Sequence, residues 1–131
     1  MFCLVDFLVA GTVDGERGQD IGTFTLKVSP NWAPIGVERM VKLLDENFFD
    51  DTKFFQVLRR PEISMAQGGV SGDPATQEKW KFNLIKDDQR LVDNKRGTFS
   101  FAASIPNSRT PQFIINLSDN GRMMVSNTVA Q

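Results

Sequence analysis

Two early segments of the chain carry the hydrophobic pattern of β-strands. Residues 2–10 are rich in β-forming side chains, and residues 21–28 alternate apolar side chains with threonine and lysine. A period of two places every second side chain on the same face of a strand. The turn-forming pair Asp14-Gly15 lies between the two segments, so the pattern predicts an antiparallel hairpin.

The pattern then changes to the 3.6-residue period of a helix. Pro34 marks the start, because proline is well suited to the first helical position. We therefore predict a helix from Pro34 to Phe48, with one buried apolar face and one exposed charged face. The apolar set is Val37, Met40, Val41, Leu44 and Phe48, and the charged set is Glu38, Arg39, Lys42 and Asp45.

The rest of the chain is predicted to be mainly short strands. The predicted strands are Lys53–Leu58, Ile63–Gln67, Thr98–Ala102 and Pro111–Leu117. Residues 70–95 are rich in turn-forming and charged side chains and are predicted to be a long irregular stretch, of a length that is usually functional or packed on a partner. One helix among many antiparallel strands predicts a β-barrel with the helix at one open end.

Composition excludes several classes of function. The 131 residues fit one domain, and 15 basic against 16 acidic residues leave a net charge of −1, which does not favour nucleic acid as a partner. The chain has one cysteine, Cys3, and no histidine. A Ser-His-Asp triad and a Cys/His zinc site are therefore excluded, and we expect no metal and no cofactor.

The chain shows no targeting or membrane segment that its sequence pattern can identify. Its longest apolar run, residues 2–11, is interrupted by Asp6 and is far shorter than the about 20 residues of a membrane span. The run also lacks a basic segment before it, so a strand is favoured over a signal peptide. We expect an intracellular protein, in a compartment that the sequence does not identify.

The segment Arg96 to Asn120, RGTFSFAASIPNSRTPQFIINLSDN, resembles the signature of the cyclophilins, the proline-isomerase family. Similarity extends upstream through Ala33–Val57 and Ile63–Gly69. The resemblance implies a mainly β, cyclophilin-like antiparallel barrel over residues 1–120, with the helix at about 34–48 covering an open end. It also implies a barrel that is incomplete at the C-terminus, with residues 121–131 as a tail or arm.

The resemblance assigns a substrate groove residue by residue. Gln56 occupies the position of the family's catalytic arginine, and Phe55 beside it is a candidate groove residue. The family's pocket methionine and peptide-binding positions are retained as Met65, Gln67, Ala102 and Gln112. Ser64 and Ile114 replace aromatic pocket residues, Ala103 replaces an asparagine, Arg122 falls near the family's tryptophan and Met123 near its pocket leucine. The implied pocket is larger and less aromatic than in the family.

The chemistry of isomerisation makes Gln56 the most informative of these positions. Rotation about an X-Pro bond crosses a barrier of about 20 kcal/mol that amide resonance sets. The family's arginine weakens that resonance by donating to the proline end of the amide. A glutamine can still donate, but without the charge. Arg59 and Arg60 follow closely and are alternative sources of a guanidinium, although a solvated turn is the favoured reading of both.

Three hypotheses remain at this stage. The first is a cyclophilin-like domain that binds a protein or a proline-containing peptide with weak or no isomerase activity, as an accessory subunit of a larger complex. The second is an active peptidyl-prolyl isomerase that assists protein folding. The third is a structural barrel whose groove is filled by its own or a neighbouring chain. A barrel without its closing strands leaves open edges, so we also expect another protein chain to cover the open edge.

Overall fold

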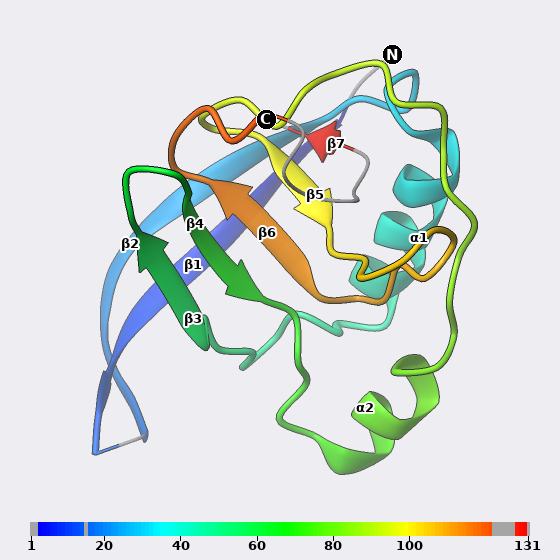
Figure 1. The fold of residues 1–131 in the computed structure, drawn as a ribbon. Coiled ribbons are helices and arrows are strands. Elements are labelled where there is room, and N and C mark those ends of the chain that lie inside the picture. The colour runs from blue at the N-terminus through cyan, green and yellow to red at the C-terminus, as the bar shows by residue number, and fades with distance from the viewer. Residues whose placement is uncertain (1–2, 15, 122–127, 131) are drawn as a thin grey trace.

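A computed structural model describes residues 3–14, 16–121 and 128–130 of the chain. These residues form an antiparallel sheet of seven strands in the order β1-β2-β7-β5-β6-β4-β3 (Figure 1). The strands are β1 (Cys3–Val13), β2 (Glu16–Val28), β3 (Gln56–Arg59), β4 (Ser64–Gly68), β5 (Phe99–Phe101), β6 (Phe113–Asn116) and β7 (Thr128–Ala130). β1 and β3 lie at the two ends of this order and do not pair with each other. The predicted mainly β, incomplete barrel is therefore confirmed.

The predicted hairpin is confirmed as β1 and β2 and is longer than its hydrophobic pattern indicated. Its pairing runs from Cys3 opposite Val28 to Val13 opposite Glu16, with irregularities on either side of Ala10. Phe7 and Phe24 face each other in this register and stack with ring centroids 5.0 Å apart. Both rings pack against the edge of the main core, so the apolar face that the alternation predicted is partly buried.

The helix α1 (Pro34–Asp45) starts where predicted, but the prediction of its buried face was partly wrong. Val37 and Met40 are buried as expected, whereas Leu43 is buried in place of Val41, which is 44% exposed. Leu44 is half-buried, and Phe48 is buried beyond the last helical residue. The buried face of the helix is thus rotated about the helix axis relative to the predicted one. The set with Val41 and the set with Leu43 both have helical spacing, so only packing decides which set is buried.

Arg39 is the second correction on α1, because it is buried and not on the charged surface. Its guanidinium donates to the backbone oxygen and to the side-chain Oδ1 of Asn83, and it lies 5.0 Å from the centre of the Trp80 ring. Burial and the nearby charge of Arg109 lower the pKa of Arg39. Partners that lie 44 residues away in sequence satisfy this charge, so the local pattern could not show its burial.

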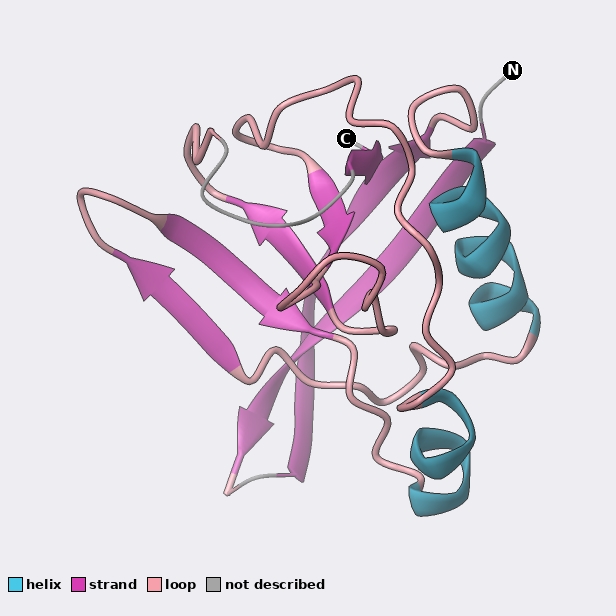
Figure 2. Ribbon diagram, turned by 45° about the vertical axis from the view of Figure 1, so that its right-hand side comes forward, coloured by secondary structure: helices cyan, strands magenta, loops and turns pink. Residues whose placement is uncertain are grey.

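A short second helix, α2 (Pro74–Trp80), lies inside the stretch that was predicted to be irregular. Asp73 caps it by accepting hydrogen bonds from the backbone nitrogen and the hydroxyl of Thr76, at 2.9 and 2.6 Å. An acidic cap followed by proline is a helix start signal that the sequence did carry. Trp80 is buried in the core, and both helices lie on the same side of the sheet (Figure 2).

Part of the predicted tail lies in the sheet of its own chain. In β7, Ala130 pairs with Val28 of β2 and with Phe99 of β5, so β7 joins the hairpin to the rest of the sheet. Arg122 and Met123 lie outside the described residues. The division into a domain of residues 1–120 and a tail stays a prediction. Neither described helix is long and apolar enough to cross a membrane.

The contact between α1 and α2 is expected to respond to acid. The carboxylate of Glu46 accepts hydrogen bonds from Lys79 at 2.6 Å and from the Trp80 indole at 2.9 Å. The bond from Lys79 is the main cause that holds the pKa of Glu46 below its ordinary value of 4.5, with desolvation opposing it and Trp80 adding to it. The folded pKa is the lower one, so this contribution to stability is present above 4.5 and is lost as the pH falls through the folded pKa.

Tryptophan fluorescence of a Trp32→Phe variant would follow this loss, since Trp80 is then the single remaining tryptophan. We expect an emission change on acidification below about pH 4.5. In a Glu46→Gln background the change should disappear, because an amide does not titrate and can still accept from the indole. The same acid response in both proteins would contradict this assignment.

Candidate functional site

Cross-strand pairing gathers four of the predicted groove residues on one face of the sheet. Gln56 of β3 lies opposite Gln67 of β4, which lies opposite Ile114 of β6. Directly opposed residues project to the same face, so these three side chains form one row across three strands. Met65 lies on the same face, two residues from Gln67, and faces Asn116.

This row lies on the face of the sheet away from the phenylalanine core. The residues between the row positions, such as Phe113 and Phe99, pack into the core with α1. Met65 and Ile114 are nevertheless 5% and 1% exposed, although they are not members of that core cluster. The apolar surface that would meet a proline ring is therefore covered in this structure.

Gln67 and Gln112 are joined directly, although 45 residues separate them in sequence. Nε2 of Gln67 donates to Oε1 of Gln112 at 3.0 Å. The backbone oxygen of Gln112 accepts from the amide of Ala102 at 2.8 Å, so Ala102 is held at the same place. Ala103 follows Ala102 in the chain and is half-buried. The structure thus brings together three of the residues that the resemblance assigned to peptide binding.

The candidate residues Gln56, Phe55 and Ser64 differ in their exposure and in the face of the sheet on which they lie. Gln56 is exposed, and Phe55 is 51% exposed with its amide donating to the backbone oxygen of Gln67 at 3.1 Å. Ser64 lies one residue before Met65, so it is on the other face of β4, opposite Arg59. Its position does not bring it to the row that Gln56, Gln67 and Ile114 form.

The alternative guanidiniums do not lie beside Gln56 in the structure. Arg59 is three residues from Gln56 in the same strand and therefore projects to the opposite face. Arg60 lies beyond the last residue of β3, in a turn where its amide donates to the oxygen of Ile63 at 2.9 Å. Gln56 is consequently a neutral donor at the β3 end of the row.

A buried amide network adjoins the Met65 end of this row and was not predicted from the sequence. Asn116 donates to the Thr98 hydroxyl at 2.9 Å, and Asn120 donates to Asn116 at 2.8 Å and to the Ser64 backbone oxygen at 2.9 Å. The Ser64 amide returns a bond to Asn120 at 3.1 Å. Asn116 and Asn120 are 1% and 3% exposed, and buried amides satisfied in this way fix the relative position of β4 and β6.

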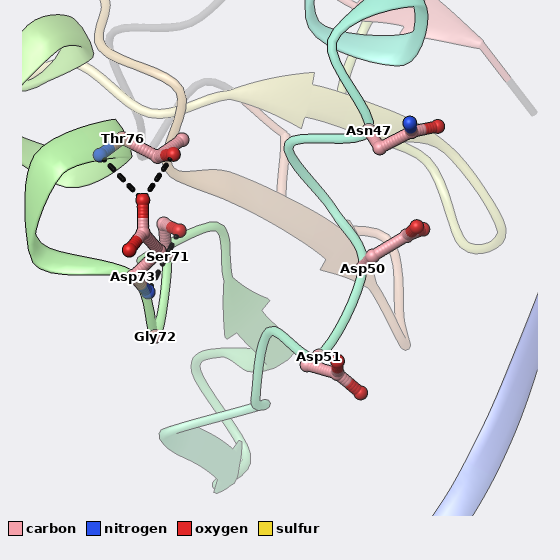
Figure 3. Close-up of a pocket in the computed structure, with 7 residues that line it drawn as sticks. All are labelled: Asn47, Asp50, Asp51, Ser71, Gly72, Asp73 and Thr76. Atoms are coloured by element: carbon pink, nitrogen blue, oxygen red, sulfur yellow. Dashed lines mark hydrogen bonds between the residues drawn. The ribbon is translucent and has the colours of Figure 1, made fainter.

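A separate cavity of about 380 Å³ lies between the loop after α1 and the start of α2. Its lining is Asn47, Asp50, Asp51, Ser71, Gly72, Asp73 and Thr76. Figure 3 shows that Asp73 turns toward Thr76, whereas Asp50 and Asp51 point away from it. The carboxylates do not converge, and no group of three potential metal ligands occurs among the described residues. None of the predicted groove residues lines this cavity.

Known proteins of one family match most of the chain. Residues 12–129 match the model of the family described as cyclophilin type peptidyl-prolyl cis-trans isomerase/CLD. The chain is 31% identical over 117 residues to a peptidyl-prolyl cis-trans isomerase of Acinetobacter baylyi, covering 88% of this chain and 60% of that protein. It is 32% identical over 101 residues to peptidyl-prolyl cis-trans isomerase B of Escherichia coli, covering 76% of this chain and 59% of that protein.

Solved structures show the same fold. A cyclophilin-type isomerase of Cryptosporidium parvum, crystallised in the presence of the dipeptide Ala-Pro, has a TM-score of 0.64 at 19% identity, covering 83% of this chain and 70% of that chain. The Mimivirus cyclophilin has a TM-score of 0.54 at 18% identity, covering 97% and 70%. The chain spans 60% and 59% of the lengths of the two bacterial relatives named above.

Proposed function

The chain belongs to the cyclophilin-type peptidyl-prolyl cis-trans isomerase family, and from this premise we propose that it binds proline-containing peptide or protein segments with weak or no turnover. The binding surface is the outer row of the sheet, formed by Gln56, Met65, Gln67 and Ile114 with Ala102 and Gln112 at its end. The joined side chains of Gln67 and Gln112 carry the binding proposal, since they present amide donors and acceptors to a peptide backbone.

The neutral donor at Gln56 supports weak turnover. A hydrogen bond to a charged group is worth about 1.5–3 kcal/mol, more than a neutral one, so losing the charge costs on the order of one to two decades in rate. The buried state of Met65 and Ile114 adds a second cost, because the apolar surface must be uncovered before a proline ring can contact it. Both effects lower turnover more than they lower binding of the flanking peptide.

An active isomerase is the second candidate. The retained residues Met65, Gln67, Ala102 and Gln112 favour it, and weak activity through Gln56 is compatible with the reaction, which needs no nucleophile and no cofactor. A role as a subunit of a larger complex is a further part of our proposal. The outer edge of β1 has no strand neighbour in the described sheet, and open edges pair readily with another chain.

Titration with an acetylated Ala-Ala-Pro-Ala amide, followed by NMR, tests the binding proposal. We expect shifts of the Gln67 and Gln112 side-chain amides, and a loss of affinity of about five- to tenfold in Gln67→Ala, because one hydrogen bond to the peptide or to Gln112 is removed. Gln19→Ala is the matched control, since Gln19 is exposed on β2 far along the hairpin. Equal affinity in Gln67→Ala and Gln19→Ala would refute this placement of the site.

A further inference from the structure

Helix α1 receives its N-terminal cap from a distant part of the chain. Ala33 stands at the capping position and offers no side-chain hydrogen bond. Asp88 takes this role: its Oδ1 accepts from the amide of Ile35 at 2.9 Å and its Oδ2 from the amide of Gly36 at 3.0 Å. A carboxylate is favoured here by the free amides and by the helix dipole. The loop that carries Asp88 is therefore fixed to the start of α1.

The same carboxylate binds a fully buried arginine. Nη2 of Arg109 lies 3.0 Å from Oδ2 of Asp88 and also donates to the backbone oxygen of Lys86. The side chains of Arg109 and Asp88 are 0% and 3% exposed. Nε and Nη1 of Arg109 have no hydrogen-bond partner in the described part of the chain.

From Arg109 a continuous set of backbone contacts leads to the groove. The Arg109 oxygen accepts from the amide of Ile85 at 3.2 Å, which places residues 85–88 alongside residues 107–109. The next residue, Thr110, donates to the oxygen of Ala102 at 3.4 Å, and Ala102 donates to the oxygen of Gln112. Gln112 then accepts from Gln67. Arg109 thus lies three residues before Gln112 in the chain, and Gln112 contacts the row through Gln67.

Stability alone does not account for this pair. A buried ion pair pays a large desolvation cost, and apolar replacements of such pairs are often neutral or stabilising. Arg109 is buried although its Nε and Nη1 atoms have no hydrogen-bond partner among the described residues. What the pair does supply is a defined geometry between the start of α1 and the loop that carries Ala102 and Gln112.

We propose that Arg109 is a positioning residue of the groove, which acts through Asp88 to hold Ala102 and Gln112 in register with Gln67. The proposal rests on the proposed function for its consequence in peptide affinity. Its structural part, the position of Gln112 against Gln67, is independent of any peptide and can be measured on the free protein.

The test is the double variant Asp88→Asn with Arg109→Met. Asparagine retains an oxygen that accepts from an α1 amide, and methionine fills the space of the arginine stem without its charge. We expect a melting temperature within about 4 °C of wild type, because the desolvation cost and the ion pair are removed together. We also expect displaced Gln67 and Gln112 side-chain amide resonances in the free protein, and an affinity for the acetylated Ala-Ala-Pro-Ala amide about five- to tenfold weaker.

Arg39→Met is the matched control. Arg39 is also buried, and the charge of Arg109 is near enough to lower the pKa of Arg39. Its hydrogen bonds nevertheless go to Asn83 and its ring contact to Trp80, so it makes no hydrogen bond to Asp88 or Gln112. This variant should lower the melting temperature and leave both the amide resonances and the affinity unchanged. Unchanged resonances in the double variant, or equal changes in Arg39→Met, would overturn the proposal. If wild type binds no peptide, the proposed function fails, and the resonances of the free protein still decide whether Arg109 positions Gln112.

Asn107→Gly gives a second route should the double variant not fold. The Asn107 side chain accepts from the amide of Asp87 at 2.8 Å, and its own amide donates to the Asp87 carboxylate at 3.1 Å, so this exposed pair braces the same two segments. Glycine removes the side chain and tolerates the positive φ of 58° at this position. We expect displaced Gln112 resonances. We also expect a peptide affinity about two- to threefold weaker, the effect of losing roughly one weak hydrogen bond. Unchanged values of both would count against the proposal.

Discussion

Gln56→Arg is expected to raise the rate of X-Pro isomerisation in a short Ala-Pro peptide by about ten- to a hundredfold over wild type. The substitution places a charged, forked donor at the β3 end of the groove row, opposite Gln67. We expect the gain to stop short of full activity, because Ile114 is buried and aliphatic and holds a proline ring less well than an aromatic residue does. NMR exchange spectroscopy on the peptide measures the rate directly.

Two controls separate the charge from its placement. Gln56→Lys adds a charge without the guanidinium fork and should give a smaller gain. Val57→Arg adds a guanidinium to the neighbouring position of β3, which projects to the other face, and should give none. A wild-type protein that already matches a competent isomerase would show that the neutral donor is not limiting, and the weak-turnover proposal would then be wrong.

Leu43→Ala is expected to lower the free energy of unfolding by about 2–5 kcal/mol, because it removes a fully buried side chain and leaves a cavity. Leu43 is 0% exposed and packs in the cluster that contains Met40, Phe48 and Phe113. Urea unfolding followed by circular dichroism gives this change as a shift of the midpoint at constant slope.

Val41→Ala on the same helix is the paired comparison. Val41 is 44% exposed, so its truncation should change stability by less than about 0.5 kcal/mol. The two residues carry the same kind of side chain two positions apart, and the original helical pattern favoured Val41 as buried. A loss at Val41 equal to that at Leu43 would show that the observed rotation of α1 is wrong.

The sequence identified some residues of the candidate site, but it could not show which of them contact one another. The family resemblance of the segment Ile63–Gly69 indicated Met65 and Gln67 together. The strand pairing places both on one face with Gln56 and Ile114. The contact of Gln67 with Gln112 crosses 45 residues and no local pattern contains it. The covering of Met65 and Ile114, and the opposite direction of Ser64, also depend on which strands pair and in what register.

The sequence by itself determined the period-two hairpin, the start of α1 at Pro34, the short strands and the family motif, because each is written in neighbouring residues through side-chain period and backbone preference. The cap of α2 at Asp73 was equally local. Only the tertiary structure decided that Leu43 replaces Val41 in the core, that Arg39 and Arg109 are buried, and that Asp88 caps α1. The cap and the two buried arginines depend on partners 21 to 53 residues away, and a buried charge is tolerated only where the fold supplies such a partner.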